Sequence, residues 1–293
     1  MKKDHKFKNE CRSCGCKDFV KILDLGKTPL ANAFLKKSEL KKTEKFFPLA
    51  LYFCKNCSLV QLRDVIAPDL LFKNYPYLTS ASKPLADHFV ELGQEIAQKF
   101  IKSKKDLVVE IGSNDGVLLA GIKNNCRVLG VDPAKNIAPL ARERGVESVS
   151  DYFNPKLAEK ILNKKGKAKV VIANNVMAHI DDIRDIFKGV KILLGRDGIF
   201  IFEVHWVGNL IGDGGFDQIY HEHLSYYSLT AAKKLVELSG LNIFDVELIP
   251  IHGESLRIYA GYKRPPEIRV NKILMLEKRL GLHKLQAYQK FAE

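Results

Sequence analysis

The sequence has no run of about 18 consecutive apolar residues, which is the length that a membrane-spanning helix needs. Its basic first segment, MKKDHKFKNE, is not followed by an apolar stretch and so is not a secretory signal. We therefore expect no membrane partner and a cytoplasmic location. With 293 residues, of which 46% are hydrophobic and 28% charged, the chain has room for one to three folded domains.

Aromatic residues are scarce in the lysine-rich stretches. The net charge is +13, but the lysines lie in segments such as KKSELKKTEK and NKKGKAK, with few aromatic residues between them. Nucleic-acid-binding surfaces commonly interleave basic and stacking residues. A solvated basic surface is therefore favoured, a preference for small anionic ligands fits equally well, and nucleic acid is not an expected partner.

Disulfides are not expected in a cytoplasmic chain, so the six cysteines need another explanation. Four of them form two Cys-x2-Cys pairs separated by 39 residues: Cys11 with Cys14, and Cys54 with Cys57. Two such pairs supply the four thiolates of a structural zinc site, and the long spacer must fold as strands. Cys16 breaks the pairing symmetry, and Cys126 is expected to be a small buried side chain. Residues 1–68 are predicted to be a zinc-binding module whose folding depends largely on the metal.

Helix and strand patterns alternate from about residue 84 onward. Residues 84–101 carry apolar residues at helical spacing, and helical stretches separate the strands that follow. The expected strands are LVVEI (107–111), RVLGV (127–131), KVVIA (169–173) and GIFIFEV (198–204). This alternation predicts an α/β fold with a parallel sheet covered on both faces. Ligands of such sheets bind at the carboxyl ends of the strands.

The full G-x-G-x-x-G motif of dinucleotide-binding enzymes is absent. The turn after the first strand reads E-x-G-x-N-D-G, and Asp132 follows the second strand, where an acid can accept hydrogen bonds from ribose hydroxyls. This pattern favours a nucleoside without a pyrophosphate, namely S-adenosylmethionine. Each residue taken alone has an ordinary alternative as a cap or turn residue. The expected cofactor-binding residues are Glu110, Gly112, Asn114, Asp115, Gly116, Asp132, Asp151, Tyr152, Asn174 and Asn175.

Several longer stretches resemble one family, the zinc-containing sugar C-methyltransferases of deoxysugar biosynthesis, which methylate C3 of nucleotide-linked 4-keto-6-deoxyhexoses. They lie between residue 11 and about residue 262, and they are CRSCG, LDLGKTPLANAFL, FPLALYFCKNCSLVQL, LFKNYPYLTSAS, VVEIGSNDGVLL, IANNVMAHI, FDQIYHEHLSYYSL and IHGESLRIYAG. One departure is Glu254, which stands where a second glycine after His-Gly is common in the family.

The resemblance implies a class I methyltransferase domain with a Rossmann-like fold over residues 69–262, including a helical lead-in. It also implies an S-adenosylmethionine-dependent enzyme with a structural zinc and a nucleotide-sugar substrate, dTDP-linked in the family. Family members continue into a second α/β domain, whereas residues 263–293 read as a helical tail. We therefore expect this tail to be the start of a missing domain, which a partner chain would supply if the activity needs it.

The segment FDQIYHEHLSYYS, residues 216–228, concentrates groups that handle protons. Methylation of a carbon beside a ketone needs a base with a pKa near neutrality and donors for the developing enolate oxygen. His223 is the expected base, Tyr220 the donor, and Glu222 a group that orients an imidazole or contacts the sugar. The resemblance adds His179 and Tyr75 as catalytic residues. The substrate-binding candidates are Tyr77 and His252, and Glu203, His205 and Trp206 are expected near the rim.

Several alternatives stay open at this point. If residues 216–228 form a turn, either His221 or Glu222 can accompany His223, and the segment can equally be a polar structural loop. His221 and His223, with Glu222 and Asp217, also resemble ligands of a catalytic metal. For the whole chain, the alternatives are a nucleic-acid methyltransferase and a truncated, inactive protein that binds the cofactor.

Overall fold

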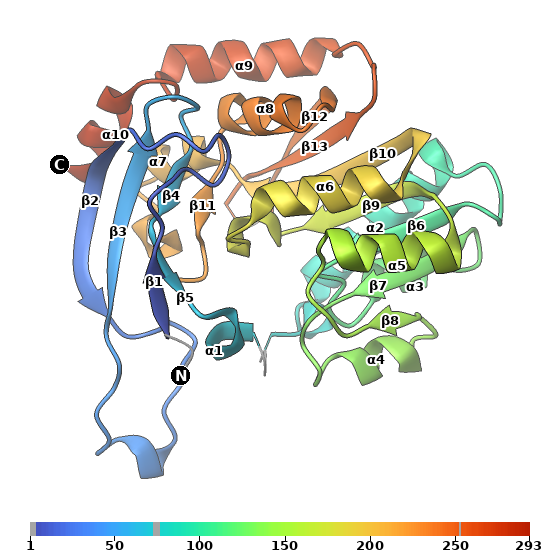
Figure 1. The fold of residues 1–293 in the computed structure, drawn as a ribbon, viewed down its shortest axis with the longest axis horizontal. Coiled ribbons are helices and arrows are strands. Elements are labelled where there is room, and N and C mark those ends of the chain that lie inside the picture. The colour runs from blue at the N-terminus through green and yellow to red at the C-terminus, as the bar shows by residue number, and fades with distance from the viewer. Residues whose placement is uncertain (1–3, 73–76, 252) are drawn as a thin grey trace.

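The computed structural model describes residues 4–72, 77–251 and 253–293, and it contains two principal sheets that lie side by side (Figure 1). The first is a four-stranded antiparallel sheet built mainly from the N-terminal residues. The second is a seven-stranded mixed sheet with helices on both faces. No helix in the described part of the chain is long and apolar enough to cross a membrane.

The N-terminal sheet carries the two cysteine pairs at its end. Its strand order is β11–β4–β3–β2, and a short antiparallel ladder of β1 and β5 lies beside it. An arm of residues 29–46, which includes the short helix η1, extends away from the body between β2 and β3 (Figure 1). The spacer between the cysteine pairs therefore folds as strands, as expected. The element bounds are β1 (His5–Phe7), β2 (Phe19–Thr28), η1 (Lys37–Glu39), β3 (Phe47–Cys54), β4 (Val60–Leu62) and β5 (Asp64–Ile66).

The seven-stranded sheet has the order β12–β13–β10–β9–β6–β7–β8, in which only β13 runs antiparallel to its neighbours. The chain enters at the centre with β6, moves out to β8 and returns to β9, so the order reverses between β6 and β9. The expected Rossmann-like fold is confirmed, with strand bounds close to those predicted. They are β6 (Leu107–Ile111), β7 (Arg127–Val131), β8 (Ser148–Val149), β9 (Ala168–Asn174), β10 (Leu194–His205), β12 (Asn242–Ile249) and β13 (Ser255–Gly261).

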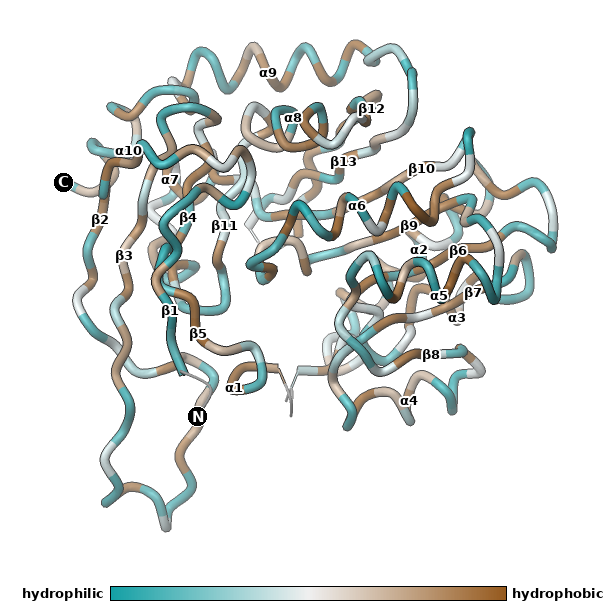
Figure 2. The backbone as a smooth tube through the Cα atoms, viewed as in Figure 1, coloured by the Kyte–Doolittle hydropathy of each residue, from teal (hydrophilic) through white to brown (hydrophobic). Residues whose placement is uncertain are grey.

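Helices cover both faces of this sheet, because its strands are apolar on both sides. Figure 2 shows the central strands as largely hydrophobic, whereas helices such as α6 alternate in hydropathy along their length. Leu107, Val109 and Ile111 pack toward α5 and α6, and Val108 packs toward α2 and α3. The helices between β5 and β10 in the chain are α1 (Pro68–Phe72), η2 (Thr79–Ala81), α2 (Lys83–Phe100), α3 (Val117–Ile122), α4 (Ala138–Glu143), α5 (Pro155–Lys165), η3 (Met177–His179) and α6 (Ile183–Leu193).

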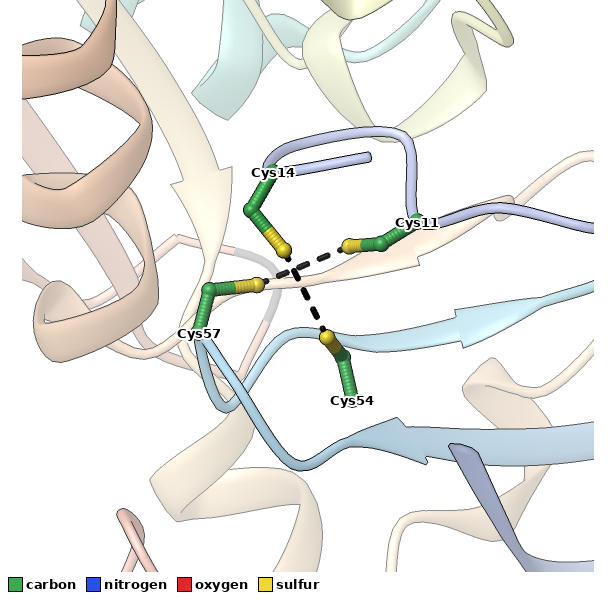
Figure 3. Close-up of side chains that lie close together, drawn as sticks. All are labelled: Cys11, Cys14, Cys54 and Cys57. Atoms are coloured by element: carbon green, nitrogen blue, oxygen red, sulfur yellow. Dashed lines mark hydrogen bonds between the residues drawn. The ribbon is translucent and has the colours of Figure 1, made fainter. Parts of the chain in front are cut away.

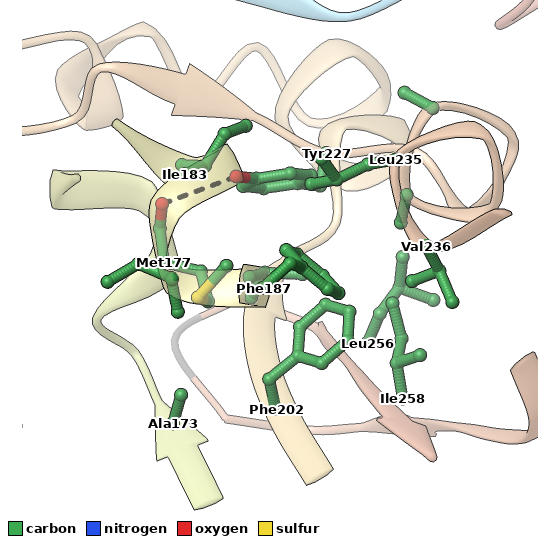
Figure 4. Close-up of a cluster of buried hydrophobic side chains, with 14 of the residues drawn as sticks. Ala173, Met177, Ile183, Phe187, Phe202, Tyr227, Leu235, Val236, Leu256 and Ile258 are labelled. Atoms are coloured by element: carbon green, nitrogen blue, oxygen red, sulfur yellow. Dashed lines mark hydrogen bonds between the residues drawn. The ribbon is translucent and has the colours of Figure 1, made fainter. Parts of the chain in front are cut away.

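A buried cluster fixes the short helix η3 on the end of the sheet. Phe187 and Phe202 pack edge to face beneath it, and the Tyr227 hydroxyl donates to the Met177 carbonyl at 3.3 Å (Figure 4). Because Met177 and Tyr227 are both almost fully buried, η3 is held between the sheet and the segment that follows β10. The remaining elements of that segment are α7 (Val207–Gly212), η4 (Phe216–Gln218), β11 (Ser225–Tyr226) and α8 (Leu229–Leu238).

The C-terminal helices α9 (Ile268–Leu280) and α10 (Leu285–Ala292) pack back onto the rest of the chain. The fully buried Glu277 of α9 accepts hydrogen bonds from the Trp206 indole at 2.8 Å and from the Thr230 backbone at 2.8 Å. It thereby caps the start of α8, where a carboxylate is favoured by the exposed backbone N–H groups. Tyr288 of α10 packs against Phe53 of β3. The helical tail predicted for residues 263–293 thus lies against both sheets.

Candidate active site and metal centre

The four predicted ligands Cys11, Cys14, Cys54 and Cys57 meet at the end of the N-terminal sheet (Figure 3). Their sulfur atoms all lie within 4.8 Å of one another, with 3.5 Å between Cys11 and Cys57 and 3.6 Å between Cys14 and Cys54. Tetrahedral Zn²⁺, with Zn–S bonds of about 2.3 Å, places its sulfur ligands about 3.8 Å apart. The geometry therefore fits a structural zinc ion with no open coordination position.

Local turns orient each cysteine pair toward the place where the four sulfur atoms meet. The Gly15 N–H donates to the Cys11 carbonyl and the Ser58 N–H to the Cys54 carbonyl, both at 2.9 Å, and both donor residues have a positive φ. The Gln61 side chain donates to the Cys11 sulfur at 3.1 Å, as suits a thiolate. Hydrogen bonds from the Cys54 and Cys57 side chains lower the pKa of Cys11, while the hydrogen bond to Cys11 raises the pKa of Cys54 to about 12. A divalent cation is what allows all four thiols to ionise together.

Cys16 lies outside this cluster. Its sulfur accepts a hydrogen bond from the Asp18 backbone at 3.3 Å, and Cys126 is a buried side chain as expected. Among the described residues, the four paired cysteines form the one cluster of metal-ligand type. The alternative of a catalytic metal at His221 and His223 is therefore not supported, since those two side chains bind different backbone carbonyls.

A cavity of about 1160 Å³ opens at the carboxyl ends of β6, β7 and β9 and extends to the β1–β5 ladder and the N-terminal arm. This volume slightly exceeds that of typical small-ligand pockets, so it can hold a cofactor together with a second molecule. Of the predicted cofactor residues, those that line it are Glu110, Gly112, Asn114, Asp132, Asp151, Tyr152, Asn174 and Asn175. The sheet therefore gathers these residues at the edge where the sequence predicted them.

The glycine-rich turn is closed by Asp132. One carboxylate oxygen accepts from the Asn114 backbone at 2.9 Å and the other from Ala134 at 2.9 Å. Gly112 has φ of +69°, and a Cβ there would lie 2.9 Å from a methyl group of Val176. A side chain at Gly112 is thus excluded both by backbone conformation and by space.

Two predicted cofactor residues support the turn from outside the cavity. The buried Asp115 accepts from the Arg144 guanidinium at 3.2 Å, and Gly116 begins α3 with φ of +75° against Ala141 and Val146. Neither lines the cavity. Their role in this structure is to fix the turn.

Buried polar atoms without protein partners mark where a ligand can bind. They include both side-chain atoms of Asn174, one carboxylate oxygen of Glu110 and the side-chain oxygen of Asn175, and all three residues line the cavity. Burial, together with the nearby Asp132 and Asp115 carboxylates, raises the pKa of Glu110 well above its usual value. Because unpaired buried polar groups are costly, these atoms suit the hydroxyl and amino groups of a bound nucleoside. The residues present fit S-adenosylmethionine.

His223 and Tyr220 form a hydrogen-bonded pair in the wall of the cavity. The imidazole Nδ1 lies 2.9 Å from the Gln218 carbonyl oxygen, and Nε2 lies 2.9 Å from the Tyr220 hydroxyl. A carbonyl oxygen only accepts, so Nδ1 carries the hydrogen and Nε2 of the neutral ring is the acceptor. The Tyr220 hydroxyl therefore donates to Nε2.

Two further imidazoles surround this pair. The ring centroids of His179 and His205 lie 5.0 Å and 5.1 Å from that of His223, and all three rings line the cavity. Burial lowers the pKa of His179 to about 4, and its Nδ1 has no protein partner. A neutral imidazole is thus part of the cavity wall.

Residues 221 and 222 form a turn, and their side chains leave the cavity wall. Glu222 accepts from the Asn32 amide of the arm at 2.7 Å, and burial raises the pKa of its carboxyl group. His221 is buried and donates to the Phe47 carbonyl at 3.2 Å. The structure thus places the Glu222 carboxylate against Asn32 of the N-terminal arm, outside the cavity lining.

The remaining predicted site residues differ in whether they line the cavity. Tyr77 lines the cavity, whereas Tyr75 and His252 lie outside the described residues. Trp206 is buried under α9 and is not part of the wall, and Glu203 is buried in an ion pair with Arg257 at 2.7 Å. Sequence reasoning missed Asn32 and Phe34 of the arm, which reach the cavity through the fold alone.

Comparisons with known proteins agree with this geometry. The family model described as a zinc binding domain matches residues 11–72, and the one described as a methyltransferase domain matches residues 84–246. The C-methyltransferase NovU of Streptomyces niveus is 37% identical over 288 residues, which cover 97% of this chain and 69% of that protein.

Solved structures are similar at a lower level. An S-adenosylmethionine-dependent methyltransferase from Thermotoga maritima has 18% identity and a TM-score of 0.46 over 61% of this chain and 92% of that one. Magnesium protoporphyrin IX methyltransferase from Synechocystis has 13% identity and a TM-score of 0.47 over 61% of this chain and 83% of that one.

The family therefore rests on the two domain matches, the NovU relationship and the four-cysteine cluster. The chain belongs to the S-adenosylmethionine-dependent C-methyltransferases that carry an N-terminal zinc-binding domain.

Proposed function

We propose that this C-methyltransferase methylates the carbon beside the ketone of a nucleotide-linked 4-keto-deoxysugar, and that Tyr220 and His223 together remove the proton from that carbon. The observation that carries the proposal is the Tyr220–His223 hydrogen bond of 2.9 Å at the cavity wall. Formation of an enolate requires a positioned acid–base pair that removes the proton from the carbon. A C-methyltransferase that does not have to activate its carbon nucleophile has no need for such a pair.

The cofactor's place is supported by the glycine-rich turn and the strand ends. Asp132, Asn174 and Glu110 offer acceptors and donors for its ribose and amino-acid groups, and Tyr152 and Asp151 border the same side. When bound there, S-adenosylmethionine supplies an electrophilic methyl group that passes to a carbon nucleophile as its S–CH₃ bond breaks. The protein's task is then to generate that nucleophile and to exclude water from it.

The fixed tautomer of His223 supports a proton relay. Because both ring nitrogens of His223 are engaged in hydrogen bonds, the phenolic oxygen of Tyr220 is our candidate for the atom of the pair that takes the substrate proton. As the C–H bond breaks, the phenolic oxygen takes that proton while its own proton moves to Nε2. The resulting imidazolium is stabilised by the Gln218 carbonyl at Nδ1.

The negative charge that develops on the ketone oxygen needs donors in a dry site. Neutral His179, whose ring centroid lies 5.0 Å from that of His223, is our candidate for this position. Tyr77 lines the same cavity and is proposed to contact the sugar. From the sequence, Tyr75 remains a catalytic candidate and His252 a substrate-binding candidate. Glu222 is proposed to hold the arm near the cavity through Asn32.

The nucleotide-sugar substrate rests on the family resemblance, on a cavity large enough for two ligands and on the net charge of +13. A net positive protein attracts diphosphate-bearing ligands through long-range electrostatics. We propose that the protein acts in the cytoplasm, where such substrates are made.

In the experiment, the protein receives methyl-labelled S-adenosylmethionine and one of three kinds of acceptor. The acceptors are a dTDP-4-keto-6-deoxyhexose, the same nucleotide sugar reduced at C4, and single- or double-stranded oligonucleotides. We expect label on C3 of the keto sugar and none on the reduced sugar, because only the ketone acidifies C3. Label on the oligonucleotides at low salt, lost at high salt, would instead support a nucleic-acid methyltransferase. Equal labelling of the keto and reduced sugars would contradict the enolate route.

A further inference from the structure

The zinc knuckle is physically joined to the two histidines of the site by one buried arginine. Arg12 lies between the ligands Cys11 and Cys14, yet its side chain is only 1% exposed and leaves the knuckle toward the methyltransferase domain. Its Nε donates to the Asp181 carboxylate at 3.1 Å. Asp181 lies two residues after His179 and also binds Lys6 at 2.6 Å and Lys8 at 3.0 Å.

Gln61 of β4 ties the same arginine to a metal ligand. Its side-chain oxygen accepts from the backbone and from Nη1 of Arg12, both at 3.2 Å, while its amide nitrogen donates to the Cys11 sulfur at 3.1 Å. Nη1 of Arg12 also donates to the Leu62 carbonyl. Gln61 is fully buried, so no water competes for these bonds.

From Leu62 the connection runs through backbone hydrogen bonds to both histidines. The Leu62 N–H donates to the Leu224 carbonyl at 3.1 Å, and the Leu224 N–H donates to the Ala178 carbonyl at 2.7 Å. Leu224 follows His223, and Ala178 precedes His179. In addition, Ser225 and Tyr226 form β11, the outer strand of the zinc module's own sheet. The segment with His223 is therefore part of the zinc module's architecture.

We infer that Arg12 is a positioning residue that couples the zinc knuckle to the relative placement of His179 and His223. The inference rests on the proposed function of those two histidines. In this arrangement the zinc centre does more than fold the N-terminal module. It also fixes the part of the cavity wall that contains His179 and His223 relative to the part that contains the predicted cofactor-binding residues. Misplacement of a catalytic group by about 1 Å costs on the order of 100-fold in rate.

Arg12→Met is the informative variant, because methionine keeps the apolar length of the side chain and Asp181 retains its two lysine partners. Replacement of one member of a buried ion pair by a hydrophobe is tolerated best when the other member stays paired. Arg12→Lys is the second variant, since lysine can reach one acceptor but cannot bridge Asp181, Gln61 and Leu62 at once. Arg184→Met is the matched control, because Arg184 pairs with Glu10 at 2.7 Å across the same interface, exposed and outside the cavity.

The test measures zinc content, S-adenosylmethionine affinity, kcat and KM for the keto sugar, and the nitrogen NMR signals of the histidine rings. We expect Arg12→Met to retain zinc and cofactor affinity, to lose about 10- to 100-fold in kcat with little change in KM, and to shift the signals of His179 and His223. Arg12→Lys should lie between it and the wild type, and Arg184→Met should match the wild type.

The inference is overturned if Arg12→Met keeps kcat and the ring signals of the wild type, or if Arg184→Met changes them equally. Failure of the proposed function looks different, since the wild type itself would then leave the keto sugar unmethylated. In that case the ring signals still decide the coupling, because they do not depend on turnover.

Discussion

The Tyr220 hydroxyl donates to Nε2 of His223 at 2.9 Å, while Nδ1 of the same ring is held by the Gln218 carbonyl at 2.9 Å. The two side chains come from one turn, three residues apart, and both line the cavity at the ends of the parallel strands. Their spacing suits the single proton-transfer unit that we propose, and a backbone carbonyl sets the orientation of the imidazole ring.

If the pair acts as a unit, Tyr220→Phe and His223→Ala should each lower kcat by about 10² to 10⁴. The double variant should lose little more than either single variant, because members of one relay are not additive. Cofactor affinity, measured by calorimetry, should stay near that of the wild type. Additive losses would contradict a relay and would favour independent roles for the two side chains.

His179 predicts a pH-dependent contribution to stability. Burial lowers its pKa to about 4, whereas a free imidazole has a pKa of about 6.5. The unfolded chain therefore binds the extra proton, so this stability is fully present above about pH 6.5 and is lost as the pH falls toward about 4. The shift corresponds to roughly 3 kcal/mol at most, at about 1.4 kcal/mol per unit.

Urea unfolding of the wild type and of His179→Gln between pH 4.5 and 7 measures this contribution. The free energy of unfolding of the wild type should fall relative to that of the variant as the pH drops, by about 2 kcal/mol over this range. His283→Gln serves as a control outside the cavity. Parallel curves for the wild type and His179→Gln would show that the buried imidazole is not held neutral.

The metal centre predicts which cysteines matter. Cys11→Ser or Cys57→Ser should remove the bound zinc and unfold the N-terminal sheet, because four thiolates supply much of the folding free energy of such a module. Cys16→Ser and Cys126→Ser should retain one zinc ion per chain, since neither sulfur belongs to the cluster. Metal analysis and thermal unfolding check this, and zinc loss in Cys16→Ser would revise the ligand set.

Glu254 sits where the family commonly has glycine, and its φ is +73°. An L-residue in this left-handed region costs roughly 1–2 kcal/mol. Glu254→Gly should therefore raise the free energy of unfolding by about 0.5–1 kcal/mol, after the entropy cost of the added glycine. Glu254→Gln, which removes the charge but keeps the strain, should have no such effect. Equal stabilisation by both variants would point to charge as the cause.

Much of this organisation follows from local patterns in the sequence. The cysteine spacing predicted the four ligands, and the apolar runs predicted β6 and β7 to the residue. Most of the polar residues predicted from the strand ends line the cavity, because parallel strands bring their carboxyl ends to one edge of the sheet.

The parts that were missed depend on contacts between residues far apart in the chain. The pairing of Asn32 with Glu222 joins residues 190 apart, and that of Arg12 with Asp181 joins residues 169 apart. No periodicity or spacing encodes such contacts. For the same reason, the sequence left the side chains of His221 and Glu222 undecided, and the turn then placed both away from the cavity. The Glu222 carboxylate binds Asn32 in this structure, and its expected role toward an imidazole or the sugar stays a prediction.

The most direct measurement is deuterium entry at C3 of a dTDP-4-keto-6-deoxyhexose in D₂O, with S-adenosylhomocysteine in place of the methyl donor. Because methyl transfer is then blocked, the signal reports proton removal alone. We predict exchange by the wild-type protein and its loss in both Tyr220→Phe and His223→Ala. Exchange that persists in both variants, or that never occurs in a wild-type protein which binds both ligands, would contradict the assignment of this pair as the proton acceptor.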